Sequence, residues 1–263
     1  YKSISKQIQQ LNLEKNDTTV EEERQKIESK IQTYHKELDK ISNIVSAGDL
    51  NQEGKNPREI FNESIKPFLI ELETGNIVAE ENFTDELNIS NFNIKEISVN
   101  PNLSASIEKS NDIADIKRKP NYMVIYEVIQ EGKIDKYILP IYGKGLWSTL
   151  YGFIALDKDL KTIKGLTFYE HGETPGLGGE VDNPRWKNQW KGKQAFDEEG
   201  NITIEVIKGI VDRSSPKSNY QIDGLSGSTI TTRGVDNLVK FWLGEQGYGP
   251  FFAKQEEVFH EQI

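Results

Sequence analysis

The sequence predicts an α+β fold in which an antiparallel β-sheet forms the core and helices flank it. Runs rich in β-branched and aromatic residues alternate with short turns in the middle of the chain, whereas helical periodicity is confined to its two ends. Gln130-Glu131-Gly132-Lys133 is typical of a hairpin turn, and Asp157-Lys158-Asp159 joins a second pair of strands. Hairpins between terminal helices favour the α+β class. The expected strands are residues 122–129, 137–142, 151–156 and 163–169, and a further strand that carries Ile202, Ile204 and Val206.

One apolar stripe predicts a long N-terminal helix. Its members recur at alternating spacings of four and three: Ile27, Ile31, Tyr34, Leu38, Ile41 and Val45. Thr19-Val20-Glu21-Glu22 has the form of a capping box, and Ala47-Gly48 ends the helix. We therefore expect an N-terminal helical region in residues 1–48, packed on its own domain or paired with a partner, and an α+β domain in residues 49–263.

The segment between this helix and the strands is the least regular. Residues 49–57 are typical of a connection, and Asn56-Pro57 opens a short helix that runs through Ile65. Residues 67–120 are polar and rich in Asn and Ser, which predicts short strands and surface loops.

Composition narrows the range of functions. The formal net charge of −10 argues against a nucleic-acid partner, because an acidic surface repels phosphate backbones. The absence of cysteine excludes cysteine-ligated iron–sulfur centres, zinc ribbons and thiol nucleophiles. The histidines, His35, His171 and His260, are far apart and form no pair with metal-ligand spacing, so we expect no metal site. No apolar run approaches transmembrane length.

A glycine-rich loop directly follows the strand that ends at Tyr169. It reads His171-Gly172-Glu173-Thr174-Pro175-Gly176-Leu177-Gly178-Gly179-Glu180. Its backbone amides can approach a ligand closely, although such a loop alone is more often a turn than a site. It is not a dinucleotide fingerprint, because Val181 stands where the next glycine is required.

A second cluster lies at the start of a C-terminal helix. The cluster reads Asp223-Gly224-Leu225-Ser226-Gly227-Ser228-Thr229-Ile230-Thr231-Thr232-Arg233-Gly234, and helical spacing continues from Val235 to Leu243, with Gly244 as the stop. We expect Thr231 or Thr232 as the N-cap. A helix start favours a phosphate, but an ordinary Ser/Thr cap explains the pattern equally well. A serine hydrolase is disfavoured, because Ser228 stands where the nucleophile elbow requires glycine.

Three blocks of the sequence resemble a known family. They are residues 145–153, residues 165–184 and the motif Asp223-x-x-Ser226-Gly227-Ser228-Thr229. They are similar to the C subunits of bacterial sodium-translocating NADH:quinone reductases, which carry covalent flavin mononucleotide (FMN). The resemblance is dense from about Tyr142 to Phe252. The usual motif has alanine where this chain has Ser228. The related G subunits of ferredoxin-linked electron-transport complexes share the flavin motif.

The resemblance implies a cofactor and a set of residues. FMN would be joined by a phosphoester to Thr229 and would carry electrons between partner redox centres. Asp223, Ser226, Gly227, Ser228 and Thr231 would present Thr229 to the flavin transferase that loads the protein. The ring would be bordered by a second group of residues, namely Trp147, Glu173, Thr174, Gly176, Leu177 and Gly178.

The resemblance also implies partners and a location. The partners would be the other subunits of the membrane reductase and, during maturation, the transferase. The family has one N-terminal transmembrane helix, which we expect just upstream of Tyr1. The domain would then lie on the extracytoplasmic side of the inner membrane, with the helical region of residues 1–48 close to that membrane. The alternatives are a G subunit of the ferredoxin-linked complex and a non-redox extracytoplasmic binding module with an ordinary helix cap.

Overall fold

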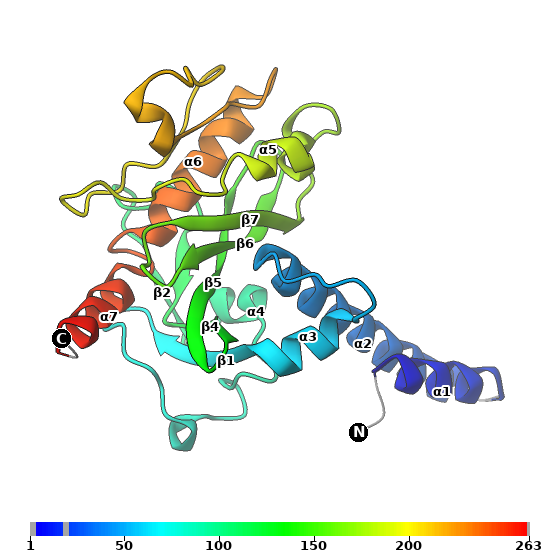
Figure 1. Cartoon of the computed structure of the whole chain (residues 1–263). Coiled ribbons are helices and arrows are strands. Elements are labelled where there is room, and N and C mark those ends of the chain that lie inside the picture. Colours follow the sequence, from blue (N-terminus) through cyan, green and yellow to red (C-terminus); the bar gives the residue numbers. More distant parts are fainter. Residues whose placement is uncertain (1–3, 18–20, 262–263) are drawn as a thin grey trace.

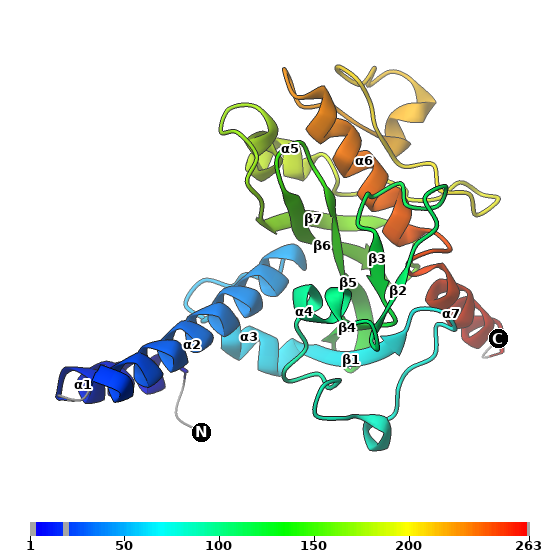
Figure 2. The same ribbon diagram turned by 180° about the vertical axis from the view of Figure 1, so that it is seen from behind.

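A five-stranded antiparallel sheet forms the core, as the sequence predicts. The structure, a computed structural model, describes residues 4–17 and 21–261. The strand order is β1-β4-β5-β6-β7. Figures 1 and 2 show helices on both sides of this sheet. The α+β prediction is therefore confirmed. The strands are β1 (Ile65–Glu71), β4 (Tyr122–Gln130), β5 (Lys133–Lys144), β6 (Thr149–Asp157) and β7 (Ile163–Glu170).

Both predicted hairpins are present. The β4–β5 turn has φ of +51° at Glu131 and +74° at Gly132, the backbone that a two-residue hairpin of the right twist requires. The β6–β7 turn is held by Asp159, whose carboxylate accepts hydrogen bonds from the amides of Lys161 and Thr162, both at 2.8 Å. The β5–β6 hairpin ends at Lys144 and therefore places residues 145–148 at one end of the sheet.

The segment expected to be irregular contributes one strand to the core sheet. The short helix predicted to open at Asn56-Pro57 is α3 (Pro57–Ser64), which begins with a capping box of Asn56 and Glu59, and β1 follows it directly. β1 is an edge strand, where Pro67 is tolerated because it removes no bond from the interior of the sheet. The rest of the segment holds η1 (Glu80–Asn82), α4 (Ile94–Val99) and a two-stranded sheet of β2 (Ser104–Ser106) and β3 (Arg118–Pro120).

The predicted strand through Ile202, Ile204 and Val206 is much shorter than expected. Only β8 (Glu205–Val206) forms there, parallel to β9 (Gln221–Ile222), and Ile202 makes an isolated bridge with Phe196. The alternation of apolar residues in this segment therefore indicates which side chains face the core, but the segment does not form a continuous β-strand. The neighbouring elements are η2 (Gly178–Asp182), α5 (Pro184–Asn188) and η3 (Pro216–Tyr220).

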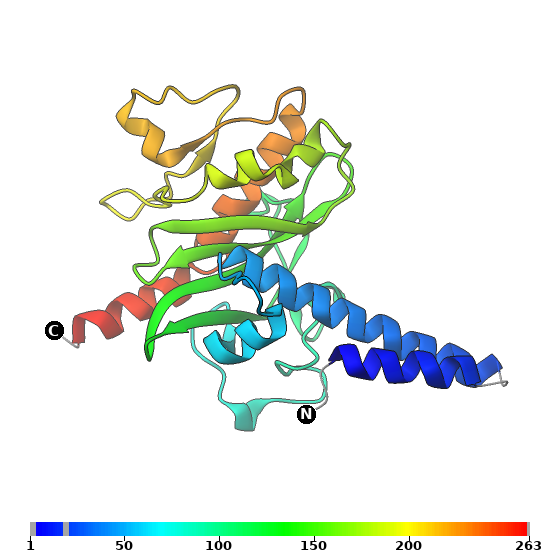
Figure 3. The same ribbon diagram turned by 45° about the vertical axis from the view of Figure 1, so that its right-hand side comes forward.

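The N-terminal region is a helical hairpin rather than one helix. The predicted helix is α2 (Glu21–Ala47), and a second helix that was not predicted, α1 (Ile4–Asp17), lies antiparallel against it (Figure 3). Ile31 packs with Ile4 and Ile8 in a small separate cluster, whereas Ile41 belongs to the main core. Thr19 and Val20 of the predicted capping box lie outside the described residues, and Glu21 is the first residue of α2. The division of the chain at residue 48 remains a prediction.

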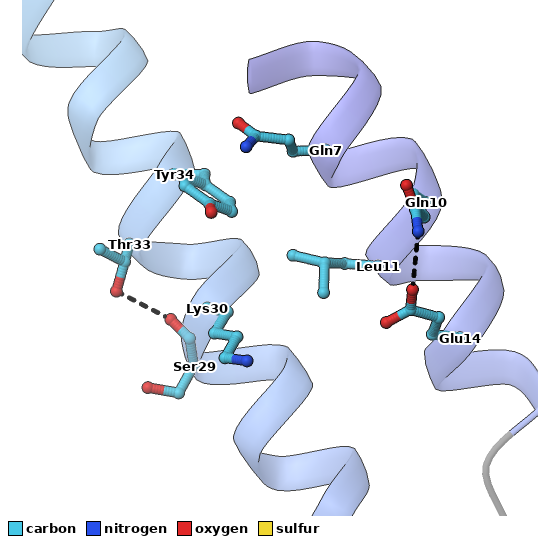
Figure 4. Close-up of a pocket in the computed structure, with 8 residues that line it drawn as sticks. All are labelled: Gln7, Gln10, Leu11, Glu14, Ser29, Lys30, Thr33 and Tyr34. Carbon is cyan, nitrogen blue, oxygen red and sulfur yellow. Dashed lines mark hydrogen bonds between the residues drawn. The ribbon is translucent and has the colours of Figure 1, made fainter. Parts of the chain in front are cut away.

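A pocket of about 380 Å³ opens between the two helices of this hairpin. Figure 4 shows Leu11 of α1 directed towards Tyr34 of α2, with polar side chains around them. The hairpin is thus held by a thin apolar seam with a polar rim. No helix within residues 4–17 and 21–261 is both long and apolar enough to span a bilayer.

The C-terminal helices close the fold. α6 (Thr229–Leu243) packs across β5, and α7 (Gly249–Glu261), which was not predicted, follows it. A Cβ on Gly234 would lie 2.4 Å from the Lys144 carbonyl oxygen, and a Cβ on Gly143 would lie 2.5 Å from Leu238 Cβ. These two glycines let the helix approach the strand closely. The start of α6 therefore lies beside the end of β5.

Candidate functional site

The start of α6 presents hydroxyl groups of unequal accessibility. Ser226 and Thr229 are exposed, and Thr229 is the first residue of the helix. Three others are buried, with Ser228 6%, Thr232 5% and Thr231 0% exposed. A large group can therefore be added at Ser226 or Thr229 without unpacking the helix. Thr229 has the further advantage of a helix start, where unpaired backbone amides favour an anion.

The prediction that Thr231 or Thr232 is the N-cap is wrong. The helix begins earlier, and the N-cap position is Ser228, whose side chain makes no capping hydrogen bond. Ser228 Oγ instead donates to Thr231 Oγ1 at 2.9 Å. Thr232 Oγ1 accepts a hydrogen bond of 2.9 Å from the amide of Leu225 in the preceding loop. None of these hydroxyls caps the helix, which does not support the alternative of an ordinary Ser/Thr cap.

Asp223 shapes the loop that leads into the motif. Its carboxylate accepts hydrogen bonds from the amide of Val211 and from the guanidinium of Arg213, both at 2.7 Å. Its carbonyl oxygen accepts the indole N–H of Trp186 at 2.8 Å. Because these contacts tie Asp223 to two other segments, α5 and residues 211–213, Asp223 positions the chain on its way to Thr229.

The glycine-rich loop lies directly against the start of α6. A Cβ on Gly178 would be 2.6 Å from Thr231 Oγ1, so only glycine fits there. A Cβ on Gly227 would be 3.0 Å from Leu177 Cδ2. The structure therefore brings together the glycine-rich loop and the start of α6, which are far apart in the sequence.

Hydrogen bonds within the loop fix its shape. The Thr174 carbonyl oxygen accepts the amide of Leu177 at 3.1 Å, and Gly176 between them has φ of +75°. The Glu173 amide donates to His171 Nδ1 at 3.2 Å, so Nε2 carries the proton and donates to Asp182 at 2.8 Å. The side chain of Thr174 is exposed at the site.

The carboxylate of Glu173 joins all parts of the site. Oε1 accepts hydrogen bonds from the amides of Trp147 (2.9 Å) and Ser148 (3.3 Å), and Oε2 accepts the amide of Leu146 (3.2 Å). Oε2 also accepts the hydroxyl of Thr231. Glu173 is therefore the contact between the turn of residues 145–148, the glycine-rich loop and α6.

This carboxylate is ionised although it is only 5% exposed. Burial raises the pKa of Glu173, but the hydrogen bonds from Thr231 and the three amides outweigh burial and hold that pKa below its usual range. Glycines leave room for the charge, since a Cβ on Gly145 would be 2.6 Å from Oε1 and one on Gly178 would be 2.8 Å from Oε2.

Exposed apolar side chains occur on the three segments that meet at Glu173 and the start of α6. Trp147 is 66% exposed, and its carbonyl oxygen accepts a hydrogen bond from the ammonium of Lys144 at 3.4 Å. Leu146, Leu177 and Ile230 are also exposed. Exposed apolar side chains on segments that meet near an exposed hydroxyl suit a flat aromatic ligand.

Ser148 was missed as a site residue, and Thr232 was expected only as an N-cap. Ser148 Oγ accepts the amide of Gly172 at 2.6 Å and so joins the turn to the loop. Thr232 holds Leu225, as described above. No sequence pattern predicts either role, because each depends on a hydrogen-bond partner, Gly172 or Leu225, that only folding brings into position.

The comparisons with known proteins point to one family. Residues 145–244 match the family described as "FMN-binding domain". The C subunit of the Na⁺-translocating NADH-quinone reductase of Pseudomonas aeruginosa is 43% identical over 225 residues, which cover 84% of each chain. The corresponding protein of Vibrio alginolyticus is 44% identical and covers 82% of this chain and 81% of the relative. The chain belongs to the family of these C subunits.

Solved structures agree with membership of the C-subunit family. The crystal structure of Shewanella oneidensis NqrC has a TM-score of 0.76 and 38% identity, and the match covers 85% of this chain and 99% of that chain. The corresponding protein of Parabacteroides distasonis has a TM-score of 0.62 at 28% identity, with 84% and 94% covered. These matches favour the C-subunit family over the related G subunits.

The residues at the site fit FMN. The exposed hydroxyl of Thr229 lies at a helix start, which suits a phosphate, and the exposed apolar side chains suit the isoalloxazine ring. Gly178 lets the glycine-rich loop pack directly against α6, so that Leu177 reaches Gly227 of the motif. Within residues 4–17 and 21–261, no cluster of His, Asp or Glu could hold a metal ion.

Proposed function

We propose that this chain is the electron-carrying C subunit of a Na⁺-translocating NADH-quinone reductase and carries FMN joined by a phosphoester to Thr229. The observation that carries the proposal is the contrast in accessibility at the motif. Thr229 is exposed on a helix start, whereas Ser228 and Thr231 are buried and hydrogen-bonded to each other. The match of residues 145–244 to an FMN-binding domain supports the choice of cofactor.

FMN, when bound, supplies reversible electron carriage that no side chain of this chain provides. The chain's own residues attach and orient it. The first turn of α6 receives the phosphate, and the turn of residues 145–148 carries the exposed Trp147. Because Glu173 binds both segments, it holds the turn and the helix in one arrangement. NADH and quinone would be handled by partner subunits.

We place the domain on the extracytoplasmic side of the inner membrane and propose that a flavin transferase loads it there. The support is the family of the relatives, which belong to a sodium-translocating reductase, and the exposed motif. A covalent tether is useful outside the cytosol, where a lost cofactor cannot easily be replaced.

Substitution of Thr229 tests the attachment. Thr229→Ala, co-expressed with the transferase, should give colourless protein whose intact mass lacks the FMN increment. Ser214→Ala is the matched control, since it removes an exposed hydroxyl that lies outside the residues assigned to the flavin transferase. Its protein should remain yellow after denaturation. A fully loaded Thr229→Ala chain would move the attachment to another hydroxyl and would sink the assignment.

A further inference from the structure

The first turns of α6 have an inner and an outer face. The inner face carries the buried Thr231 and Thr232, and the outer face carries the exposed Thr229, Ile230 and Arg233. Thr229 and Arg233 are four residues apart, so their Cβ atoms lie about 5–6 Å from each other on one face of the helix. Helical side chains lean towards the N-terminus, which directs Arg233 back over Thr229.

We propose that the guanidinium of Arg233 binds the phosphodiester that FMN forms with Thr229. The inference rests on the proposed attachment and adds the cation that neutralises it. A guanidinium presents two parallel N–H donors that match two phosphate oxygens, so it suits this position better than a point charge.

The electrostatics of the helix start explain why a cation is needed. Glu173 places an ionised carboxylate against Thr231, on the inner face of the same turn. Its donors are amides and a hydroxyl, and no ion pair of Glu173 occurs in the part of the chain that the structure describes. The positive end of the helix dipole is thus already shared with one anion. A phosphodiester adds a second anion to this turn, in a chain of net charge −10.

The other cations near the motif have different contacts. The guanidinium of Arg213 donates to the carboxylate of Asp223 at 2.7 Å, on the far side of the loop that enters α6. The ammonium of Lys144 donates to the Trp147 carbonyl oxygen at 3.4 Å. Among the described residues, Arg233 has neither a hydrogen bond nor an ion pair, and its side chain is exposed. It is therefore free to take the phosphate.

The test compares the chain with and without FMN. Wild type and Arg233→Gln are each produced with and without the flavin transferase, and intact mass with peptide mapping establishes loading at Thr229 before any melting. Arg233→Gln should leave the thermal midpoint of the unloaded chain unchanged. In the loaded chain it should lower the midpoint by about 1–3 °C, because an exposed ion pair is lost. The difference should shrink in 1 M salt, since salt screens exposed charges.

Two matched variants remove one positive charge elsewhere. Lys144→Gln removes the neighbouring cation, and Lys133→Gln removes a cation at the opposite end of β5. Both should shift the loaded and unloaded midpoints equally. In addition, the anisotropy of flavin fluorescence should fall in loaded Arg233→Gln only, because the tether gains freedom.

Two results would overturn the assignment of Arg233. One is an equal effect of Arg233→Gln on loaded and unloaded chains, and the other is an FMN-dependent effect found for Lys144→Gln instead. A wild-type chain that carries no FMN at Thr229 would contradict the attachment itself, and the mass measurement separates that failure from the first two.

Discussion

A buried carboxylate is costly to a protein unless several donors surround it. Glu173 meets this condition through donors from two distant parts of the chain, the amides of residues 146–148 and the hydroxyl of Thr231. Each carboxylate oxygen accepts two of these four hydrogen bonds, so both oxygens are fully occupied. We therefore regard Glu173 as the residue that positions Trp147 relative to α6, rather than as a direct contact of the flavin ring.

Glu173→Gln should destabilise the fold. The amide oxygen of glutamine can replace only one carboxylate oxygen, so the donors at the other face an NH₂ group. Unpaired buried donors cost roughly 1–3 kcal/mol each, and the free energy of unfolding at pH 7 should fall by about 2–4 kcal/mol in urea denaturation. Glu170→Gln is the control, because Glu170 forms an exposed ion pair with Lys95 and should cost less than about 1 kcal/mol.

The cost of Glu173→Gln should depend on pH. The pKa of Glu173 is lower in the folded chain than in the unfolded chain, so the ionised group stabilises the fold fully above the unfolded pKa. That contribution is lost as the pH falls through the folded pKa. The stabilities of wild type and variant should therefore converge below about pH 4.3, the usual pKa of a glutamate. A constant difference down to pH 3 would contradict this role.

At the scale of elements, the glycine-rich loop contains two glycines with different surroundings. A Cβ on Gly178 would collide with Thr231 and Glu173, whereas nothing lies within 4 Å of a Cβ on Gly176. Gly176 has instead a φ of +75°, which costs another residue about 1–2 kcal/mol of backbone strain. The loop therefore depends on Gly178 for packing and on Gly176 for conformation.

Alanine at these two positions should separate the two roles. Gly178→Ala should displace Glu173 or the first turn of α6 and should shift the absorption spectrum and midpoint potential of the attached FMN. Gly176→Ala should lower stability slightly and change the flavin much less. Both chains should still be loaded at Thr229, as intact mass will report. Wild-type spectra and potentials in Gly178→Ala would show that the loop is only a turn.

The sequence predicts those elements whose signal is local. Hairpin turns, the stripe of α2 and the helical spacing of α6 depend on residues close together in the chain, and all three are confirmed. β1 was missed because Lys66 and Pro67 interrupt its pattern, although pairing with β4 suffices to form an edge strand. α1 was missed because its apolar residues are few and are buried only against α2.

At the scale of the whole molecule, motifs were predictable and their assembly was not. The resemblance located the residues of the site in three separate blocks, but no pattern in the sequence predicts that Glu173 binds Thr231, 58 residues away. The predicted N-cap was wrong because the hydroxyls of Thr231 and Thr232 form hydrogen bonds with Glu173 and Leu225, which lie outside the helix. Contacts over such distances follow from the order of strands and the packing of α6 on β5.

The extracytoplasmic placement can be tested on the whole chain in its membrane complex. The chain contains no cysteine, so one introduced thiol gives an unambiguous signal. Lys133→Cys, in the exposed β4–β5 turn, should react with a membrane-impermeant maleimide in intact spheroplasts. Ile138→Cys, in the core, should react only after denaturation. Labelling of Lys133→Cys only after lysis would place the domain in the cytoplasm.

The α1–α2 hairpin has a mechanical consequence. α2 has 27 residues and is therefore about 40 Å long, and its last turns are anchored in the main core by Ile41, Ile44 and Val45. Its other end is stiffened by α1, with a small apolar cluster of its own. Such an element behaves as a rigid spacer rather than a flexible linker, because bending it would disrupt either the small apolar cluster or the main core. A rigid spacer keeps the flavin-binding domain at a fixed distance from the point where the hairpin is attached. The stiffness of the hairpin, as well as its length, would therefore decide which partner sites the cofactor can reach.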